Sequence, residues 1–356
     1  MAHPPRVADS GRWAWGNSVQ DFCQYGILLP HFGTQARRER LVESAQQVER
    51  YGFDAVWVRD HLVFHPHGHE DQDRTHVDPF VVLSAIAAVT RRLILATGSL
   101  IPHRHPIHSA LLLGSLDFIA GSKRIIAGMG LGTYDHEFVA SGMEGWDRRE
   151  VVREQVEIFH KLWRGGPVSH EGRYYRFQDV EIRPTPTGGT LPVWYCGTSA
   201  ASVRRAVEYC DGWIPGRTPR REYRRLMQRM RRLALEAGKP LPMAGVIPYV
   251  VPARTYEEAV RAINLGETLK EADRLYPPPP SGRYETLDDL DGAVIAGPPE
   301  RIAEEVRRFQ AEGAVHVVFD MRLRFDAWEE CLGMIGEEVL PELRRGDPAV
   351  RAVGGR

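Results

Sequence analysis

Short apolar runs alternate with longer segments of helical periodicity along most of this chain. The runs typical of buried strands span residues 25–30, 54–58, 92–98, 124–130, 192–197, 212–216, 244–251 and 315–319. Most are followed by a segment in which apolar residues recur every three or four positions, as in an amphipathic helix. Short apolar strands alternating with helices indicate a parallel sheet covered by helices. Eight of each favour an α/β fold of the (β/α)8 TIM-barrel type over an open doubly wound sheet.

Two long excursions interrupt this alternation. Residues 165–190 have the pattern of a β-hairpin and precede the fifth strand, whereas residues 252–297 follow the seventh. Long connections on a barrel often serve its active site, so we expect both insertions, after strands four and seven, to border that site. We predict one barrel domain over residues 24–345, with an N-terminal arm over 1–23 and a C-terminal tail over 346–356.

The composition indicates a globular protein: 43% of the residues are hydrophobic and 26% charged, and the formal net charge is −1. A balance this close to neutral does not favour nucleic acid or an anionic membrane as a partner. No apolar run approaches the roughly 18 residues that a membrane span needs. The arginine-rich segment 217–232 is a candidate nucleic-acid patch, but Leu226 and Met230 recur in it at helical spacing, which favours a solvated outer helix.

Cysteine usage and the N-terminus bear on the cellular compartment. The four cysteines lie far apart and form no CxxC pair. The first residues lack the apolar segment of a secretory signal. We therefore expect a cytoplasmic protein whose thiols are unpaired.

The candidate catalytic residues are those that end the strands, because the active sites of such barrels lie at the carboxyl ends of the strands. Asp60 and His61 end the second strand, and Gly98 and Ser99 end the third. A histidine exchanges protons readily at neutral pH, and Asp60 supplies a neighbouring charge. We therefore predict that His61 is an acid or base in catalysis.

The segment "CGTSAAS" (196–202) is a candidate phosphate site. Its small residues open a helix, where free backbone N–H groups and the helix dipole attract an anion, and the hydroxyls of Thr198, Ser199 and Ser202 are within reach. An ordinary helix cap formed by the same serine or threonine explains the pattern equally well.

The stretch 57–79 contains five histidines, which raises the possibility of a metal site. A catalytic zinc ion needs about three protein ligands that converge from rigid positions. No histidine ends strands five or six, so a metal-dependent hydrolase remains a remote alternative. The other histidines of this stretch are expected to lie on a surface loop near the rim of the barrel. They are His65, His67, His69 and His76.

Several linked motifs, among them "GFDAVWVRDHLV", "GLGTYDHEF" and "PVWYCGTSAAS", resemble the bacterial luciferase-like superfamily. The resemblance covers about residues 24–345. It implies a (β/α)8 barrel that binds FMN or the deazaflavin coenzyme F420, in a homodimer or a larger homo-oligomer.

The resemblance also implies roles for individual residues. Asp60 matches an acidic position near the cofactor ring, and His61 matches a histidine that acts as acid or base. Gly98 and Ser99 match a bulge that carries a cis peptide bond in several members. The remaining matches concern the cofactor side chain and its phosphate, and they are Gly130, Gly132, Thr133, Gly197, Thr198 and Ser199.

Two positions depart from known members. Leu131 stands where the luciferase has an arginine, and Thr133 stands where deazaflavin sugar-phosphate dehydrogenases have a catalytic glutamate. The sequence as a whole is most similar to the F420-dependent branch. This similarity implies hydride transfer to or from a small organic substrate. His105, Tyr134 and the 252–297 excursion would then shape the substrate pocket. An FMN-dependent monooxygenase supplied by a flavin reductase is the alternative, and a relative that binds ligand without turnover also stays open.

Overall fold

The structure is a computed structural model that describes residues 23–66, 70, 72–121 and 123–345. The predicted arm before Cys23, the predicted tail, His67 and His69 lie outside them.

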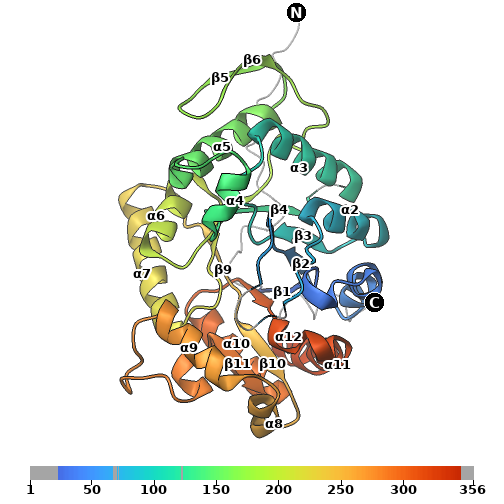
Figure 1. Ribbon diagram of the computed structural model, residues 1–356, viewed down its shortest axis with the longest axis vertical. Helices are drawn as coiled ribbons and strands as arrows, with labels where there is room; N and C mark the ends of the chain where they lie inside the picture. Colours follow the sequence, from blue (N-terminus) through green and yellow to red (C-terminus); the bar gives the residue numbers. More distant parts are fainter. Residues whose placement is uncertain (1–22, 67–69, 71, 122, 346–356) are drawn as a thin grey trace, which may run out of the picture.

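Eight parallel strands close into a barrel, in the order β1-β12-β9-β8-β7-β4-β3-β2 (Figure 1). Every described strand residue of β1, β2, β3, β4 and β12 is buried, as expected where side chains fill the barrel and helices cover it. The predicted barrel is confirmed. Its strands are β1 (Gln24–Leu28), β2 (Ala55–Val58), β3 (Ile94–Thr97), β4 (Ile125–Met129), β7 (Val193–Cys196), β8 (Gly212–Ile214), β9 (Met243–Val246) and β12 (His316–Phe319).

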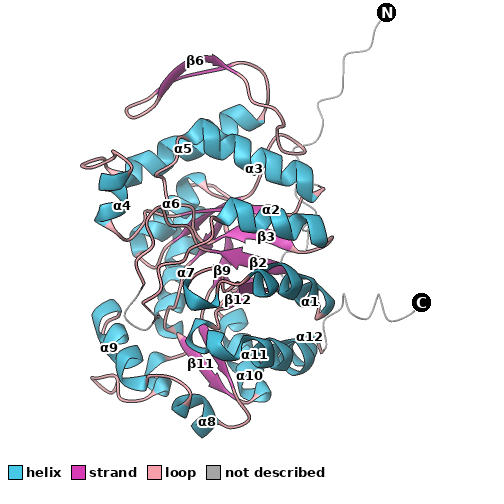
Figure 2. Cartoon of the chain, turned by 45° about the vertical axis from the view of Figure 1, so that its right-hand side comes forward, coloured by secondary structure: helices cyan, strands magenta, loops and turns pink. Residues whose placement is uncertain are grey.

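Most of the helices surround the barrel (Figures 1 and 2), and the residues that they bury are mainly apolar. Sequence signals fix several of their ends: Asp78 caps α2 ahead of a proline, and Gly121 ends α3 in the left-handed conformation. In the described part of the chain, no helix is long and apolar enough to cross a membrane. The helices are α1 (Ser44–Arg50), α2 (Pro79–Val89), α3 (Pro106–Ala120), α4 (Asp135–Ala140), α5 (Arg148–Trp163), α6 (Ala200–Tyr209), α7 (Arg220–Glu236), α8 (Tyr256–Arg261), α9 (Leu265–Leu275), α10 (Pro299–Ala311), α11 (Trp328–Met334) and α12 (Leu340–Arg344).

The arginine-rich segment forms the loop before α7 and most of α7 itself. Leu226 and Met230 are buried, so the predicted outer amphipathic helix is confirmed. Several of its arginines pair with neighbouring carboxylates, which spreads much of the positive charge over ion pairs. The pairs are Arg220 with Asp291 and Glu305, Arg224 with Glu312, and Arg225 with Glu222.

The two excursions form separate structures. The first contains the predicted hairpin, β5 (Val168–Glu171) and β6 (Arg176–Val180), paired antiparallel. The expected single strand over 244–251 is wrong: Ile247 and Pro248 interrupt it, and β10 (Tyr249–Pro252) pairs with β11 (Val294–Gly297) in a small parallel sheet, while Tyr249 still bridges Asp320 after β12. Proline lacks the N–H that a continuing barrel strand would need. Figure 2 shows this sheet beside α8, α9 and α10.

A neutral histidine lies inside the barrel. His316 is fully buried, and its Nε2 accepts a hydrogen bond from Trp57 Nε1 at 2.9 Å. The opposite nitrogen, Nδ1, lies 2.9 Å from Gln24 Oε1 and donates to it. Burial lowers the pKa of His316 to about 3, so the ring is uncharged in the folded protein at neutral pH.

Acid is therefore expected to destabilise this fold before carboxylates titrate. The pKa of His316 is about 6.5 in the unfolded chain and about 3 in the folded protein. Between these two pH values, His316 is protonated in the unfolded chain and neutral in the folded protein. The free energy of unfolding should fall across that window, by roughly 5 kcal/mol in full from this residue. Urea denaturation between pH 7 and 4 measures the slope. His316→Gln should make it shallower, exposed His108→Gln should not, and equal slopes in all three proteins would contradict the assignment.

Candidate active site

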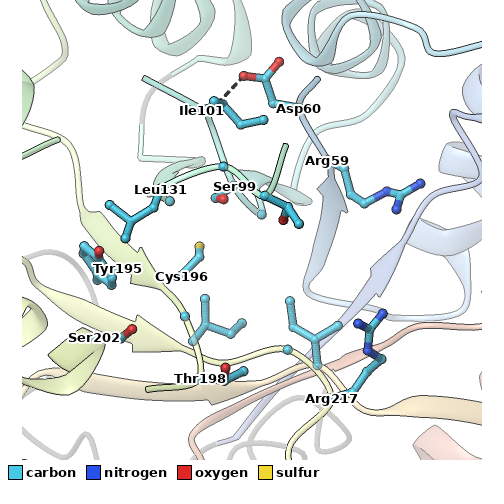
Figure 3. A pocket seen from close by; sticks show the side chains of 18 of the residues that line it. Arg59, Asp60, Ser99, Ile101, Leu131, Tyr195, Cys196, Thr198, Ser202 and Arg217 are labelled. Atoms are coloured by element: carbon cyan, nitrogen blue, oxygen red, sulfur yellow. Dashed lines mark hydrogen bonds between the residues drawn. The ribbon is translucent and has the colours of Figure 1, made fainter. Parts of the chain in front are cut away.

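The carboxyl ends of the barrel strands surround a cavity of about 420 Å³ (Figure 3). The structure brings together around it ten of the twelve residues predicted for the site: Asp60, His61, Gly98, Ser99, Gly130, Gly132, Thr133, Gly197, Thr198 and Ser199. Leu131 and Asp320 also line it. His105 and Tyr134 do not: His105 caps α3, and the Tyr134 ring lies 5.9 Å from the His61 ring, next to the site.

Close packing explains two of the glycines. A Cβ atom on Gly130 would lie 2.1 Å from Ser99 Oγ, and one on Gly197 would lie 2.4 Å from Ser202 Oγ. Both separations are far below van der Waals contact, so only glycine leaves the serine hydroxyls where they are. The Gly98–Ser99 peptide bond is cis, as the resemblance implies.

The N-terminus of α6 supplies donors at one end of the cavity. Ser199 Oγ accepts from Ser202 N at 3.1 Å, which is a helix cap, and lies 2.9 Å from Ser202 Oγ. The two interpretations of this segment are thus compatible, because the capping serine also lines the cavity with Thr198. Hydroxyls and the amide groups of the first helical turn together form a site suited to a phosphate.

Asp60 is held by neighbours on the opposite wall. Its Oδ2 accepts from Ile101 N at 3.0 Å, the contact drawn in Figure 3. Arg104 donates a hydrogen bond to each oxygen of Asp60, from Nη2 to Oδ1 at 2.8 Å and from Nη1 to Oδ2. A carboxylate occupied in this way is suited to fixing the loop after β3 rather than to exchanging protons. Arg104 was missed by sequence reasoning.

His61 has a buried carboxylate as its partner. Its Nδ1 lies 3.3 Å from Glu137 Oε2, and Glu137 is fully buried. Glu137 Oε1 also accepts from the N–H groups of Leu62 (2.7 Å) and Val63 (3.2 Å). Burial raises the pKa of Glu137, but the hydrogen bonds from His61, Leu62 and Val63 outweigh it and leave that pKa below its usual value.

This pairing selects the state of the imidazole. An ionised Glu137 is only an acceptor, so Nδ1 of His61 carries the hydrogen and Nε2 is left for proton exchange with a ligand in the cavity. A histidine oriented by a buried carboxylate is a common arrangement in acid–base catalysis. Sequence reasoning missed Glu137, although it lies in the loop "GMGLGTYDHE" that leaves the fourth strand.

The other described histidines of the 57–79 stretch have different surroundings. His76 lies behind His61, with ring centroids 5.4 Å apart, and burial followed by the charge of His61 lowers its pKa to about 4. His65 stacks on His136 at 3.9 Å, outside the residues that line the cavity. Among the described residues, no three histidine, cysteine, aspartate or glutamate side chains are grouped to hold a metal ion.

Arginines form the wall near β12, and sequence reasoning did not find them. Arg59, Arg217 and Arg322 all line the cavity. Arg322 pairs with Asp320, Nε to Oδ2 at 2.8 Å, and with Glu70 at 3.3 Å. Arg217 bonds to Tyr249 and pairs with Glu271 at 3.3 Å. Each of them follows the end of a barrel strand within three residues, which is the same positional signal that points to Asp60 and His61.

The excursions take no direct part in the cavity. None of the described residues of 165–190 or 252–297 lines it. The second excursion instead supports the arginine wall from behind, because Tyr276 donates to the carbonyl of Arg217 and Glu271 of α9 pairs with its guanidinium. This corrects the expectation that both border the site.

Comparisons with known proteins agree with this architecture. A family model described as Luciferase-like monooxygenase matches residues 23–316. The chain is 27% identical over 337 residues to the F420-dependent glucose-6-phosphate dehydrogenase of Microbacterium testaceum, covering 88% of this chain and 97% of the relative. It is 30% identical over 193 residues to the F420-dependent hydroxymycolic acid dehydrogenase of Mycobacterium tuberculosis, covering 53% of this chain and only about half, 51%, of that relative.

Solved structures share the fold. An F420-dependent secondary alcohol dehydrogenase in complex with an F420-acetone adduct has a TM-score of 0.74 at 20% identity, covering 91% of this chain and 99% of the other. The oxygenating constituent of 3,6-diketocamphane monooxygenase from Pseudomonas putida, in complex with FMN, has a TM-score of 0.73 at 21% identity, covering 90% and 99%. One fold thus serves proteins with either cofactor, so the fold does not choose between them.

Proposed function

Because the chain belongs to the luciferase-like monooxygenase family and is similar to F420-dependent dehydrogenases, we propose that it is an F420-dependent enzyme that transfers hydride to or from a small organic substrate. The observation that carries the proposal is one cavity that joins the donor-rich N-terminus of α6 to the His61–Glu137 pair. The F420-dependent relatives support the choice of cofactor. Thr133 at the cavity argues against the sugar-phosphate substrate of one of them.

The residues present fit such a cofactor. Thr198, Ser199 and Ser202 would hold its phosphate at the start of α6, and the glycines at 130 and 197 leave the space that a Cβ atom would fill. When bound, the deazaflavin supplies a carbon centre that accepts or gives hydride and does not activate O₂.

The protein's own residues then have distinct tasks. His61 would hold or release a proton at Nε2, next to the substrate, while Glu137 keeps its Nδ1 protonated. Asp60, locked by Arg104 and Ile101, would fix the wall against which the ring packs. Leu131 and Ile101 line the cavity with apolar surface, which helps to exclude water from the reacting atoms.

Parallel titration of the cofactor-free protein with F420 and with FMN tests this proposal. We expect F420 to bind with micromolar or tighter affinity, followed by cofactor fluorescence, and FMN to bind at least tenfold more weakly. Gly197→Ala should weaken binding by roughly 10- to 100-fold, because its Cβ would displace Ser202. Tight binding of FMN alone would instead favour a monooxygenase that depends on a reductase, and binding of neither would contradict the proposed site.

The homodimer implied by the resemblance stays a prediction. It is supported by large apolar side chains that remain exposed on α2 and α3, which pack side by side: Val81 is 63%, Phe118 74% and Ile119 54% exposed. Apolar surface of this kind on adjacent helices is typical of a protein interface.

A further inference from the structure

We propose that the substrate carries a carboxylate group, which Arg59 binds on the arginine wall of the cavity. The inference rests on the proposed function, since it assigns the substrate class of the same site. It begins from an arginine whose hydrogen-bonding capacity is only partly used.

Arg59 is buried and held in one orientation. Its side chain is 9% exposed, its guanidinium carbon lies 3.4 Å from the centre of the Phe32 ring, and Nη1 lies 3.1 Å from Glu70 Oε1. Among the described residues, nothing accepts a hydrogen bond from Nε or Nη2, and both atoms are buried. Burial, followed by the charge of Arg322, lowers the pKa of Arg59 to about 10, which still leaves it protonated at neutral pH.

The two unused donors determine the shape of the missing partner. Nε–H and Nη2–H lie on one edge of the planar guanidinium and point in nearly the same direction. This fork matches the two oxygens of a carboxylate, which accept both bonds in one plane. A buried charged donor left without an acceptor is costly. Since the described residues supply no acceptor for these two donors, we assign that role to a group of the ligand.

The charges around Arg59 are largely paired with one another. Glu70 is shared between Arg59 and Arg322, and Asp320 is engaged by Arg322 through Nε. Both Glu70 and Asp320 act on the charge of Arg59, but neither accepts a hydrogen bond from its Nε or Nη2. Arg217, on the same wall, is paired with Glu271, so the selectivity for a carboxylate comes from the unpaired edge of Arg59.

The position also separates this group from the proposed cofactor phosphate. Figure 3 shows Arg59 and Arg217 on one side of the cavity and Tyr195 and Ser202 on the other. A ligand with its phosphate at the start of α6 thus approaches the arginine wall with its opposite end. A carboxylate substrate would fill the space between that end and Arg59.

The test uses protein loaded with F420 and two probes of the same shape, benzoate and neutral benzamide, followed by calorimetry and by cofactor fluorescence. We expect benzoate to bind at least tenfold more tightly than benzamide. Arg59→Met should weaken benzoate by about 10- to 100-fold and leave benzamide and the F420 dissociation constant within threefold of wild type. Arg59→Lys, which keeps the charge without the fork, should fall between, and exposed Arg38→Met serves as the control.

The opposite results overturn the inference. Equal benzoate affinity in wild type and Arg59→Met would show that the fork binds no carboxylate. Loss of F420 affinity in the variants with unchanged benzoate binding would assign Arg59 to the cofactor. Because benzoate is also titrated into the cofactor-free protein, a failure of F420 binding, which would contradict the proposed function, is recognised separately from a failure of the carboxylate site.

Discussion

Replacing His61 with alanine is expected to lower turnover by about 10²- to 10⁴-fold while the cofactor dissociation constant stays within a few-fold of wild type. The imidazole lines the cavity and is oriented by Glu137, so its loss removes the group placed to move a proton at the substrate. A substrate is first sought among alcohols and hydroxy acids. Single-turnover kinetics of the F420-loaded enzyme with that substrate then measures the effect on the chemical step separately from the effect on binding.

A matched control lies a short distance away. His136 stacks near the site, on Tyr134 and His65, yet it does not line the cavity. His136→Ala should therefore change turnover less than about threefold. Full activity in His61→Ala would remove the histidine from the mechanism, and weakened cofactor binding with normal turnover at saturation would make it a binding residue instead.

Glu137→Gln is expected to lower turnover by about 10²- to 10³-fold without removing any group that touches the cavity. The new amide oxygen can still accept from Leu62 and Val63, which places the NH₂ group opposite His61 Nδ1. Nδ1 must then accept, the ring hydrogen moves to Nε2, and the histidine presents the wrong tautomer. The equivalent change from carboxylate to amide in serine proteases costs about 10⁴-fold.

A positioning role predicts more than a loss of rate. KM and cofactor affinity should stay near wild type in Glu137→Gln, and the dependence of turnover on pH should change shape, which mere loosening of the fold would not cause. Glu137→Asp keeps the acceptor and should recover part of the rate. If Gln and Asp variants lose activity equally, with a lowered melting temperature, Glu137 acts through stability alone.

Local sequence was sufficient for the barrel and for one side of the site. Strands such as β2 and β3 are short, predominantly apolar runs in which every residue is buried, and this pattern can be recognised from the local sequence alone. Residues that directly follow such strands must reach the carboxyl end of the barrel, so Asp60, His61 and Ser99 were found from position alone. The split of 244–251 was missed because both halves are equally apolar, and only the place where each pairs distinguishes them.

Partners that meet across the barrel mouth could not be read in this way. Glu137 is 76 residues from His61, and Arg104 is 44 from Asp60, yet each forms the contact that sets the behaviour of its partner. Arg59, Arg217 and Arg322 come from three different strand ends and share one wall. The alternation of apolar strands and amphipathic helices along the sequence indicates which residues reach the rim of the barrel. Their pairing depends on barrel closure and on the paths of the loops, which are set by packing between distant segments.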